Sequence, residues 1–432
     1  MLSAFSNSLK IPELRQRIFF TCAMLFLCRL LAVIPLPGVN MAVLHDAMAR
    51  HAANGSAGFF GLLDLFSGGA LTAAAVGALG IMPSISASII LQLMTAVVPA
   101  LERLAREGDA GRQKIIQYGR YLTVALCIVQ GFGFAAVVFG GLGIVDPGQL
   151  VLLPKIPFLL LAVLGMTTGT MLLMWFGEQI TARGIGNGIS LIITVSIVSR
   201  LPAALEQTAA MLKTGDANIF TLVVMLVLAF LVVAGVVAVT QAQRKIPVQY
   251  AKRVVGRKTY GGQSTYMPLR VNYSGVMPII FASAILMFVE KALEYIPATK
   301  SFAQTYLVRG DSVLYVTLYG LMILFFSYFW VATQFHPVQI ADDLKKYGGY
   351  VPGIRPGKPT VEYITKIAGR LTIVSAIFLA IVASIPTLIS RFTGLSTGFG
   401  GTSLIIAIGV ALDTQRAIET QLVMRNYSGF LK

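Results

Sequence analysis

The sequence predicts an all-helical protein that crosses a membrane many times. Of its 432 residues, 56% are hydrophobic and only 12% are charged, and the mean hydropathy is +0.78. Soluble domains carry about 25% charged residues, so a water-soluble globule of this size is excluded. The few charges are biased in sign, since 34 Lys and Arg outnumber 18 Asp and Glu and give a net charge of +16. A membrane protein with basic loops on one side fits both facts.

Ten apolar stretches are long enough to cross the hydrocarbon core as helices, which takes about 20 residues. They run at 18–36, 75–100, 117–139, 153–175, 184–201, 218–240, 274–296, 313–334, 371–390 and 402–423. An even number of spans places both termini on the same side. The spans also divide into five in residues 1–210 and five in residues 211–432, and two odd-numbered halves would form an inverted repeat.

The distribution of basic residues predicts the orientation. With the N-terminus in the cytoplasm, cytoplasmic segments hold 25 of the 34 Lys and Arg, the opposite side holds eight, and Arg29 lies within a span. The acids divide almost evenly between the two sides, so the cytoplasmic face carries nearly all of the positive charge. Both termini are therefore predicted to be cytoplasmic.

The stretch from Phe59 to Ala100 does not fit a plain bundle. It holds one charge, Asp64, and is too long for one span, but it has no polar loop that would divide it into two. Because Gly68 and Gly69 break it early, we expect a short helix that enters from the outer side, followed by a full span from about Ala75. Broken backbone at membrane depth must be covered by protein or line a cavity. The alternative is an amphipathic helix on the outer surface.

Two predicted cytoplasmic connections are longer than crossing requires. Residues 241–273 hold seven basic residues and no acid, and apolar side chains alternate at Ile246, Val248 and Tyr250, which favours a strand-like finger. Residues 337–370 contain Pro-Gly pairs on either side of Arg355, which predict a tight turn. Topology or attraction to anionic lipid would explain the charge alone. Length and turn chemistry favour docking of a large acidic or nucleic-acid-bearing partner.

The sequence carries no motif for catalysis, metal binding or a cofactor. The three cysteines lie in apolar runs, the three histidines are scattered in loops, and no phosphate-binding P-loop occurs. Ion-coupled carriers usually place several ionisable groups inside their spans, whereas here Arg29 is the only one well inside a continuous span. We expect Arg29 to pair with carbonyl groups or with Asp64. A secondary transporter with inverted repeats is the runner-up function, and an intramembrane protease is a distant third.

Several long motifs, in the same order along the chain, resemble the SecY family of bacterial protein-translocation channels. The resemblance runs from Leu14 to Leu431, and its most specific stretches are Phe66–Leu71, Ala78–Pro83, Ile85–Ile90, Gly177–Thr181, Arg183–Ser190, Tyr250–Arg253, Gln263–Thr265, Phe281–Ser283, Val351–Gly357 and Gly400–Leu404. One departure is the pair Thr240-Gln241, where the family often has an acid followed by arginine.

The resemblance implies a clamshell of ten helices in two inverted halves around an hourglass pore. A plug half-helix at about 60–73 would contain Leu65, Phe66, Ser67, Gly68, Gly69 and Ala70. The constriction ring would be formed by Ile81, Ile85, Ile189, Ile193, Ile280 and Ile406, although spacing alone favours a plain apolar core as the interpretation of these residues. A lateral gate would involve Ser86, Gln92 and Phe288. The docking residues would be Arg244, Lys245, Lys252, Arg253 and Arg355.

The resemblance also implies the partners and the location. The chain would lie in the bacterial cytoplasmic membrane with SecE and SecG subunits. It would dock the SecA motor ATPase or the ribosome, whose rRNA phosphates the basic loops would contact. It would conduct signal sequences and unfolded polypeptides across the membrane, and release membrane segments sideways into the lipid. With no nucleotide site or catalytic residue of its own, it would draw energy from these partners.

Overall fold

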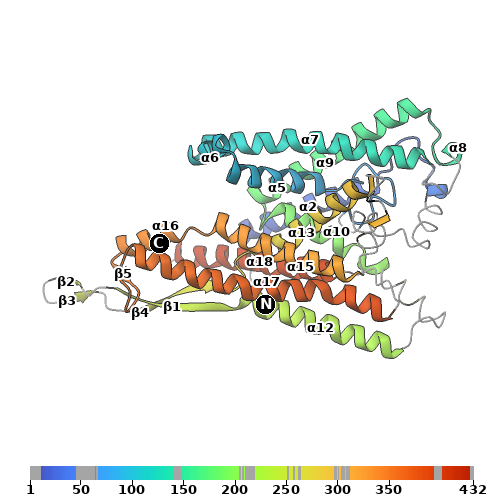
Figure 1. Cartoon of the computed structure of the whole chain (residues 1–432). Coiled ribbons are helices and arrows are strands. Elements are labelled where there is room, and N and C mark those ends of the chain that lie inside the picture. Colours follow the sequence, from blue (N-terminus) through green and yellow to red (C-terminus); the bar gives the residue numbers. More distant parts are fainter. Residues whose placement is uncertain are drawn as a thin grey trace. The chain divides into compact units, whose positions relative to one another are not determined.

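The structure is a computed structural model of the chain. It describes residues 11–44, 64, 67–140, 147–203, 206, 209, 219–250, 253–255, 258–260, 264–295, 299, 301–302, 307, 312–393 and 401–428. The fold divides into two compact units (Figure 1). Unit 1 comprises Met1–Lys213 with Val410–Lys432, and unit 2 comprises Thr214–Gly409.

Several helices of unit 1 begin or end next to a proline or a glycine. Pro99 follows Val98, which has extended dihedrals, and the chain bends by 102° at this break between two helices. Asn187 caps the last helix of the unit by accepting the N–H groups of Ile189 and Ser190. The helices are α2 (Pro12–Val33), α5 (Met82–Val97), α6 (Pro99–Arg106), α7 (Asp109–Phe139), α8 (Pro147–Leu150), α9 (Lys155–Arg183) and α10 (Gly188–Val198).

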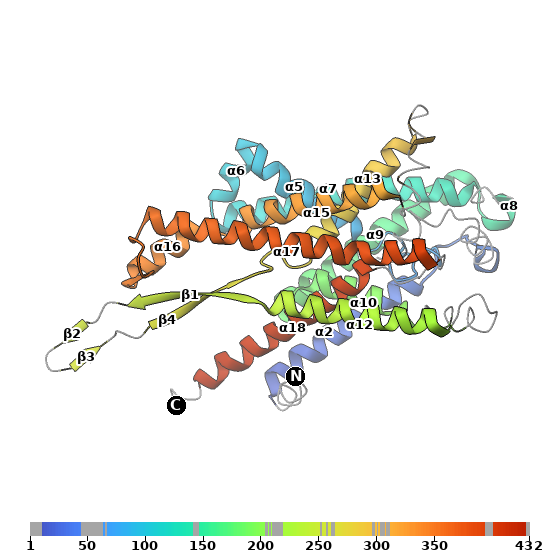
Figure 2. The same cartoon turned by 60° about the horizontal axis from the view of Figure 1, so that its bottom comes forward.

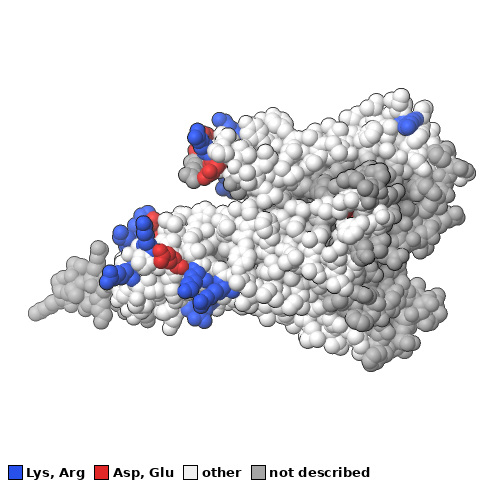
Figure 3. Space-filling view, viewed as in Figure 1, with Lys and Arg blue, Asp and Glu red and all other residues white. Residues whose placement is uncertain are grey.

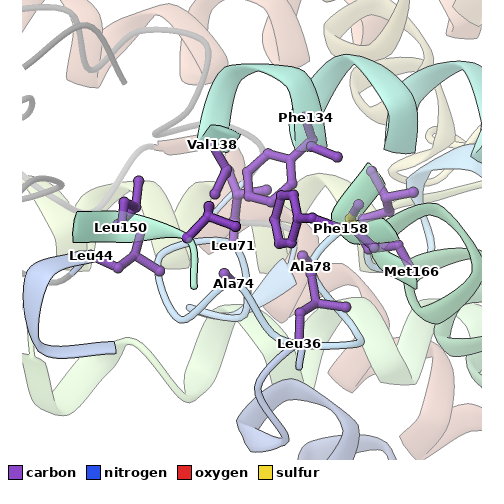
Figure 4. Close-up of a cluster of buried hydrophobic side chains, with 14 of the residues drawn as sticks. Leu36, Leu44, Leu71, Ala74, Ala78, Phe134, Val138, Leu150, Phe158 and Met166 are labelled. Carbon is purple, nitrogen blue, oxygen red and sulfur yellow. The ribbon is translucent and has the colours of Figure 1, made fainter. Parts of the chain in front are cut away.

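A buried cluster of unit 1 joins α7 and α9 to the chain that precedes α5. Figure 4 shows Leu71, Ala74 and Ala78 facing the side chains of Phe134 and Phe158. The remaining labelled residues are Leu36, Leu44, Val138, Leu150 and Met166. Because Leu71 and Ala74 are fully buried, the segment between them is a fixed part of the core.

Unit 2 combines long apolar helices with an antiparallel sheet. Ser312 caps one helix by accepting the N–H of Tyr315 at 3.0 Å, and the helix ends at Gln334, shortly before Pro337. The helices are α12 (Ile219–Gln241), α13 (Met277–Tyr295), α15 (Val313–Gln334), α16 (Pro337–Lys346), α17 (Lys358–Thr393) and α18 (Gly401–Ser428), of which α18 begins in unit 2 and ends in unit 1.

The finger between α12 and α13 contains the strands β1 (Gln243–Tyr250), β2 (Arg253–Val255), β3 (Lys258–Tyr260) and β4 (Ser264–Arg270). A short fifth strand, β5 (Gly349–Tyr350), completes a three-stranded sheet in the order β4-β1-β5. Figure 2 shows β1 and β4 running side by side away from α12. The predicted strand character of the finger is confirmed, since Ile246 and Val248 are buried on one face and pair with Met267 and Thr265.

The predicted helical, multi-span character is confirmed. In the part of the chain that the structure describes, five helices are long and apolar enough to cross a membrane, or six if the bent pair α5 and α6 forms one span. Three further apolar helices are shorter, at Gly188–Ala203, Leu226–Gln241 and Met277–Leu286. Each predicted span overlaps a helix, and α15 has the predicted bounds of 313–334. The predicted span 75–100 overlaps two helices, α5 and the start of α6.

Two expectations in the 59–100 region were wrong in detail. The second span was expected from about Ala75, but helix α5 begins at Met82. Pro83 explains this start, because its ring and missing N–H are compatible only with the first turn of a helix. Among the described residues of the expected plug half-helix, only Asp64 and Ser67 are helical, and residues 68–74 form turns.

Candidate functional site

The turns before α5 hold the backbone of the plug segment, which we define as residues 64–70. The N–H of Gly69 donates to the carbonyl of Asp64 at 3.1 Å, and the Ser67 hydroxyl donates to the same carbonyl at 3.2 Å. The N–H of Ala75 then donates to the carbonyl of Ala70 at 2.9 Å. The segment therefore ends at a residue anchored in the core. Leu65 and Phe66 lie outside the described residues.

Two arginines bind this segment, one from α2 and one from the turn after α10. The Arg29 guanidinium on α2 donates to the carbonyl of Gly68 at 3.1 Å, which confirms its expected pairing with a carbonyl. The expected alternative partner, Asp64, instead forms an ion pair with Arg200 at 2.6 Å. Arg200 was missed in the sequence because it follows the last turn of α10, 136 residues along the chain from Asp64.

Gly68, the first of the two glycines in the plug segment, lies directly against α10. Gly68 has φ +68, and a Cβ there would lie 2.9 Å from the backbone of Ser196 and would also contact Arg29. No larger residue fits this position without displacing α10 or Arg29. Ser67 and Ser196 also line a small cavity together with Ile81 and Ile192. The plug segment is therefore in contact with the helices that carry candidate ring residues.

Four of the candidate ring isoleucines belong to unit 1. Ile81 caps α5 and accepts the N–H of Ile85 at 3.2 Å, so these two residues lie one helical turn apart. Both are buried, at 1% and 7% exposed. On α10, Ile193 is buried and Ile189 is half-buried, with its side chain over Gly177 of α9.

The other two candidate ring isoleucines belong to unit 2, and both are 1% exposed. Ile280 lies on α13, one turn after Val276, and Ile406 lies on α18, one turn before Gly409. A Cβ at Gly409 would overlap the side chain of Val276. This close approach packs the residue that precedes α13 against α18.

The glycine-rich start of α10 depends on close backbone contact with α9. A Cβ on Gly188 would overlap the carbonyl of Gly177, and a Cβ on Gly184 would lie 2.7 Å from the carbonyl of Ile180. Thr21 of α2 accepts the N–H of Ile185 at 3.2 Å. The glycine-rich segment is therefore a close-packed helix start, and it holds the helix that carries Ile189 and Ile193 against its neighbours.

We expect Gly188→Ala to lower the stability of unit 1. Overpacking a core costs about 1–3 kcal/mol, and here the added methyl group meets backbone, which cannot rotate away. Gly133→Ala on α7 is the matched control, because a Cβ there has no neighbour within 4 Å. Thermal unfolding of the purified variants in detergent measures both. A Gly188→Ala midpoint equal to that of Gly133→Ala would contradict the close contact.

In unit 2, the two long loops form one folded body. Gln249 on β1 pairs with Tyr350 on β5, and the Tyr350 hydroxyl donates to the Gln249 side chain at 3.1 Å. One buried cluster contains residues from the finger, the end of α15, the second loop and α17: Ile246, Leu269, Phe335, Val351 and Ile364. The base of the finger and the second loop therefore share one buried core.

The predicted tight turn at Arg355 is confirmed. Gly353 and Gly357 have φ +81 and +109, which favour glycine, and the N–H of Ile354 donates to the carbonyl of Val351 at 3.0 Å. The Thr360 hydroxyl donates to the carbonyl of Arg355 at 2.9 Å. The backbone of the turn is thus fixed from both sides, while the Arg355 side chain is exposed.

Basic side chains gather at one end of each unit taken by itself (Figure 3). In unit 1 they lie on α6 and at the start of α7, and in unit 2 they lie around α16 and the base of the finger. Arg244 and Lys245 on β1 are exposed. Lys252 and the side chain of Arg253 lie outside the described residues. Within the described part, no group of acidic, His and Cys side chains is placed to hold a metal ion.

Comparison with known proteins identifies the family. The SecY family model matches residues 75–415. The protein translocase subunit SecY of Streptomyces galbus is 44% identical over 444 residues, and that of Mycobacterium tuberculosis H37Rv is 43% identical over 447, with 100% of both chains covered in each case. The chain belongs to the SecY family. An inverted-repeat secondary transporter is therefore not supported.

Solved structures show the same fold at low sequence identity. A structure described as a protein conducting channel is 18% identical, with a TM-score of 0.64 and 94% of this chain and 92% of that chain covered. A second concerns the plug domain of a SecY protein, at 18% identity, TM-score 0.62 and the same coverage. Sec61 in a canine ribosome-channel complex is 17% identical, with a TM-score of 0.56, again at 94% and 92%.

The candidate gate residues of this SecY-family chain lie on α5 and α13. Ser86 is buried, and Gln92 is half-buried with a side-chain oxygen that has no hydrogen-bond partner among the described residues. The side chain of Phe288 lies outside the described residues. An unpaired amide oxygen in an apolar helix is costly to bury.

Proposed function

We propose that this SecY-family chain is the pore-forming subunit of a protein-conducting channel. It carries unfolded preproteins across a bacterial cytoplasmic membrane and releases apolar segments sideways into the lipid. The observation that supports this best is the packing of the plug segment against α2 and α10, next to Ile81. A segment held by polar contacts beside apolar ring residues suits a seal that can be displaced.

The proposed pore ring consists of Ile81, Ile85, Ile189, Ile193, Ile280 and Ile406. Branched apolar side chains can close around an extended polypeptide without offering an ion a hydrogen bond, and a narrow apolar constriction gates by dewetting. The proposed arrangement has ten spans in two inverted halves, 1–210 and 211–432, with both termini cytoplasmic. The lateral gate, with Ser86, Gln92 and Phe288, would open as a signal sequence partitions into the lipid.

The proposed partners supply the energy, since the chain itself is proposed to have no catalytic step. The exposed cations of the joined loops, Arg244, Lys245 and Arg355, together with Lys252 and Arg253, would dock the SecA motor ATPase or the phosphates of ribosomal RNA. The canine Sec61 structure was determined in a ribosome-channel complex, which supports the ribosome as a partner. SecE and SecG subunits would complete the channel.

Removal of residues 62–69 tests the channel and its plug. This deletion spares Ala70 and Leu71, both buried in the core, so the fold of unit 1 should survive. We expect the ion current through the resting channel in planar bilayers to rise by about tenfold or more. A loss of about 1.4 kcal/mol in the stability of the closed state already changes the equilibrium between closed and open channels tenfold. A resting current equal to that of the intact chain would contradict the plug.

A further inference from the structure

The ion pair between Asp64 and Arg200 is the strongest polar contact of the plug segment. Its atoms lie 2.6 Å apart, and the Asp64 side chain is 3% exposed, whereas that of Arg200 is 31% exposed. A buried carboxylate is stable as a charge only when it is paired and hydrogen-bonded. Asp64 meets this condition, because its carboxylate also accepts the N–H of Thr72 at 3.0 Å.

These contacts join three parts of unit 1 through one side chain. Asp64 begins the plug segment, Thr72 belongs to the anchored turn that follows it, and Arg200 follows α10. The Asp64 carboxylate thus closes the segment into a loop and ties that loop to the helix of Ile189 and Ile193. Arg29 adds one bond, to the carbonyl of Gly68, which is a weaker attachment than an ion pair.

We infer that Arg200 is a positioning residue for the plug, and that its bond to Asp64 sets how readily the resting channel opens. The inference rests on the proposed function and deepens it. When the plug moves away from α10, the ion pair must break and Asp64 must become hydrated or find another cation. That exchange costs free energy each time the channel opens, so the ion pair favours the closed channel.

Arg29 binds a neutral carbonyl group, so its contribution to holding the plug segment differs from that of Arg200. Arg29 donates to a carbonyl that any residue at position 68 would carry, and its replacement leaves no buried charge unpaired. Replacement of Arg200 leaves the Asp64 carboxylate buried without its counter-ion. We therefore expect replacement of Arg200 to raise the resting ion current strongly and replacement of Arg29 to raise it less.

A double-mutant cycle in planar bilayers tests the inference. We expect Arg200→Gln and Asp64→Asn each to raise the resting ion current about tenfold, and the double variant to conduct no more than either single variant. Arg120→Gln is the matched control, because it breaks an exposed ion pair with Glu178 of similar length, 2.7 Å, in the same unit. Its resting current should equal that of the unmodified chain.

Three outcomes are decisive. A resting current unchanged in both single variants, while the 62–69 deletion raises it, would overturn the role of Arg200 and leave the plug intact. Currents that multiply in the double variant would show that the two residues act independently, and would also overturn it. If the deletion itself leaves the current unchanged, the proposed plug fails, and the inference fails with it. Membrane levels of each variant exclude loss of folding.

Discussion

Replacement of Arg355 by glutamate is expected to abolish secretion driven by the motor ATPase. The side chain is exposed on a turn whose backbone is fixed by Gly353, Gly357 and the hydroxyl of Thr360, so it presents its charge at a constant position. A glutamate there would place an anion against an acidic or phosphate surface, and like charges in contact cost several kcal/mol. The measurement is uptake of a preprotein into proteoliposomes with purified motor protein.

Two variants separate docking from a general effect of charge. Arg355→Lys keeps the charge but loses the planar donor fork, so we expect reduced uptake that falls further with added salt. Lys155→Glu makes the same change in charge at the start of α9, which is predicted to face outward, and should leave uptake unchanged. Normal export by Arg355→Glu, at normal membrane level, would contradict the docking role.

The helices could largely be predicted from the sequence, because their signal is local. An apolar run such as 313–334 fixes its own hydrogen bonds, and Ser312 and Pro337 limit it on either side. The start of α5 was the main error, because apolar composition alone does not distinguish helix from buried turns. Pro83 was the available signal, and the positive φ of Gly80 and Ala74 accompanies the turns before it.

The long-range contacts of the site could not be predicted from local patterns. Pairing of Asp64 with Arg200 requires knowing that the plug segment lies against the end of α10. The joining of the two loops through Gln249 and Tyr350 likewise links residues 101 positions apart. Each loop could be identified by its charge and turn chemistry, but the shared buried cluster could be seen only in the folded chain.

Capture of a translocating polypeptide tests the central claim most directly. Cysteines are placed at position 81, at the start of α5, and at position 189, on α10. Helix α10 contacts the plug segment, and position 81 lies next to it. A preprotein arrested partway through the channel would carry thiol-reactive crosslinkers at several positions along its length. These crosslinkers react with the placed cysteines. Phe230→Cys on α12 is the control, because that side chain is 71% exposed on an apolar helix and is expected to face lipid.

The account predicts crosslinks from the arrested chain to positions 81 and 189, and none to position 230. When no preprotein is present, a cysteine at position 81 should be protected from soluble thiol reagents, because Ile81 is 1% exposed in this structure. Crosslinks at position 230 with none at 81 or 189 would contradict a pore lined by these isoleucines.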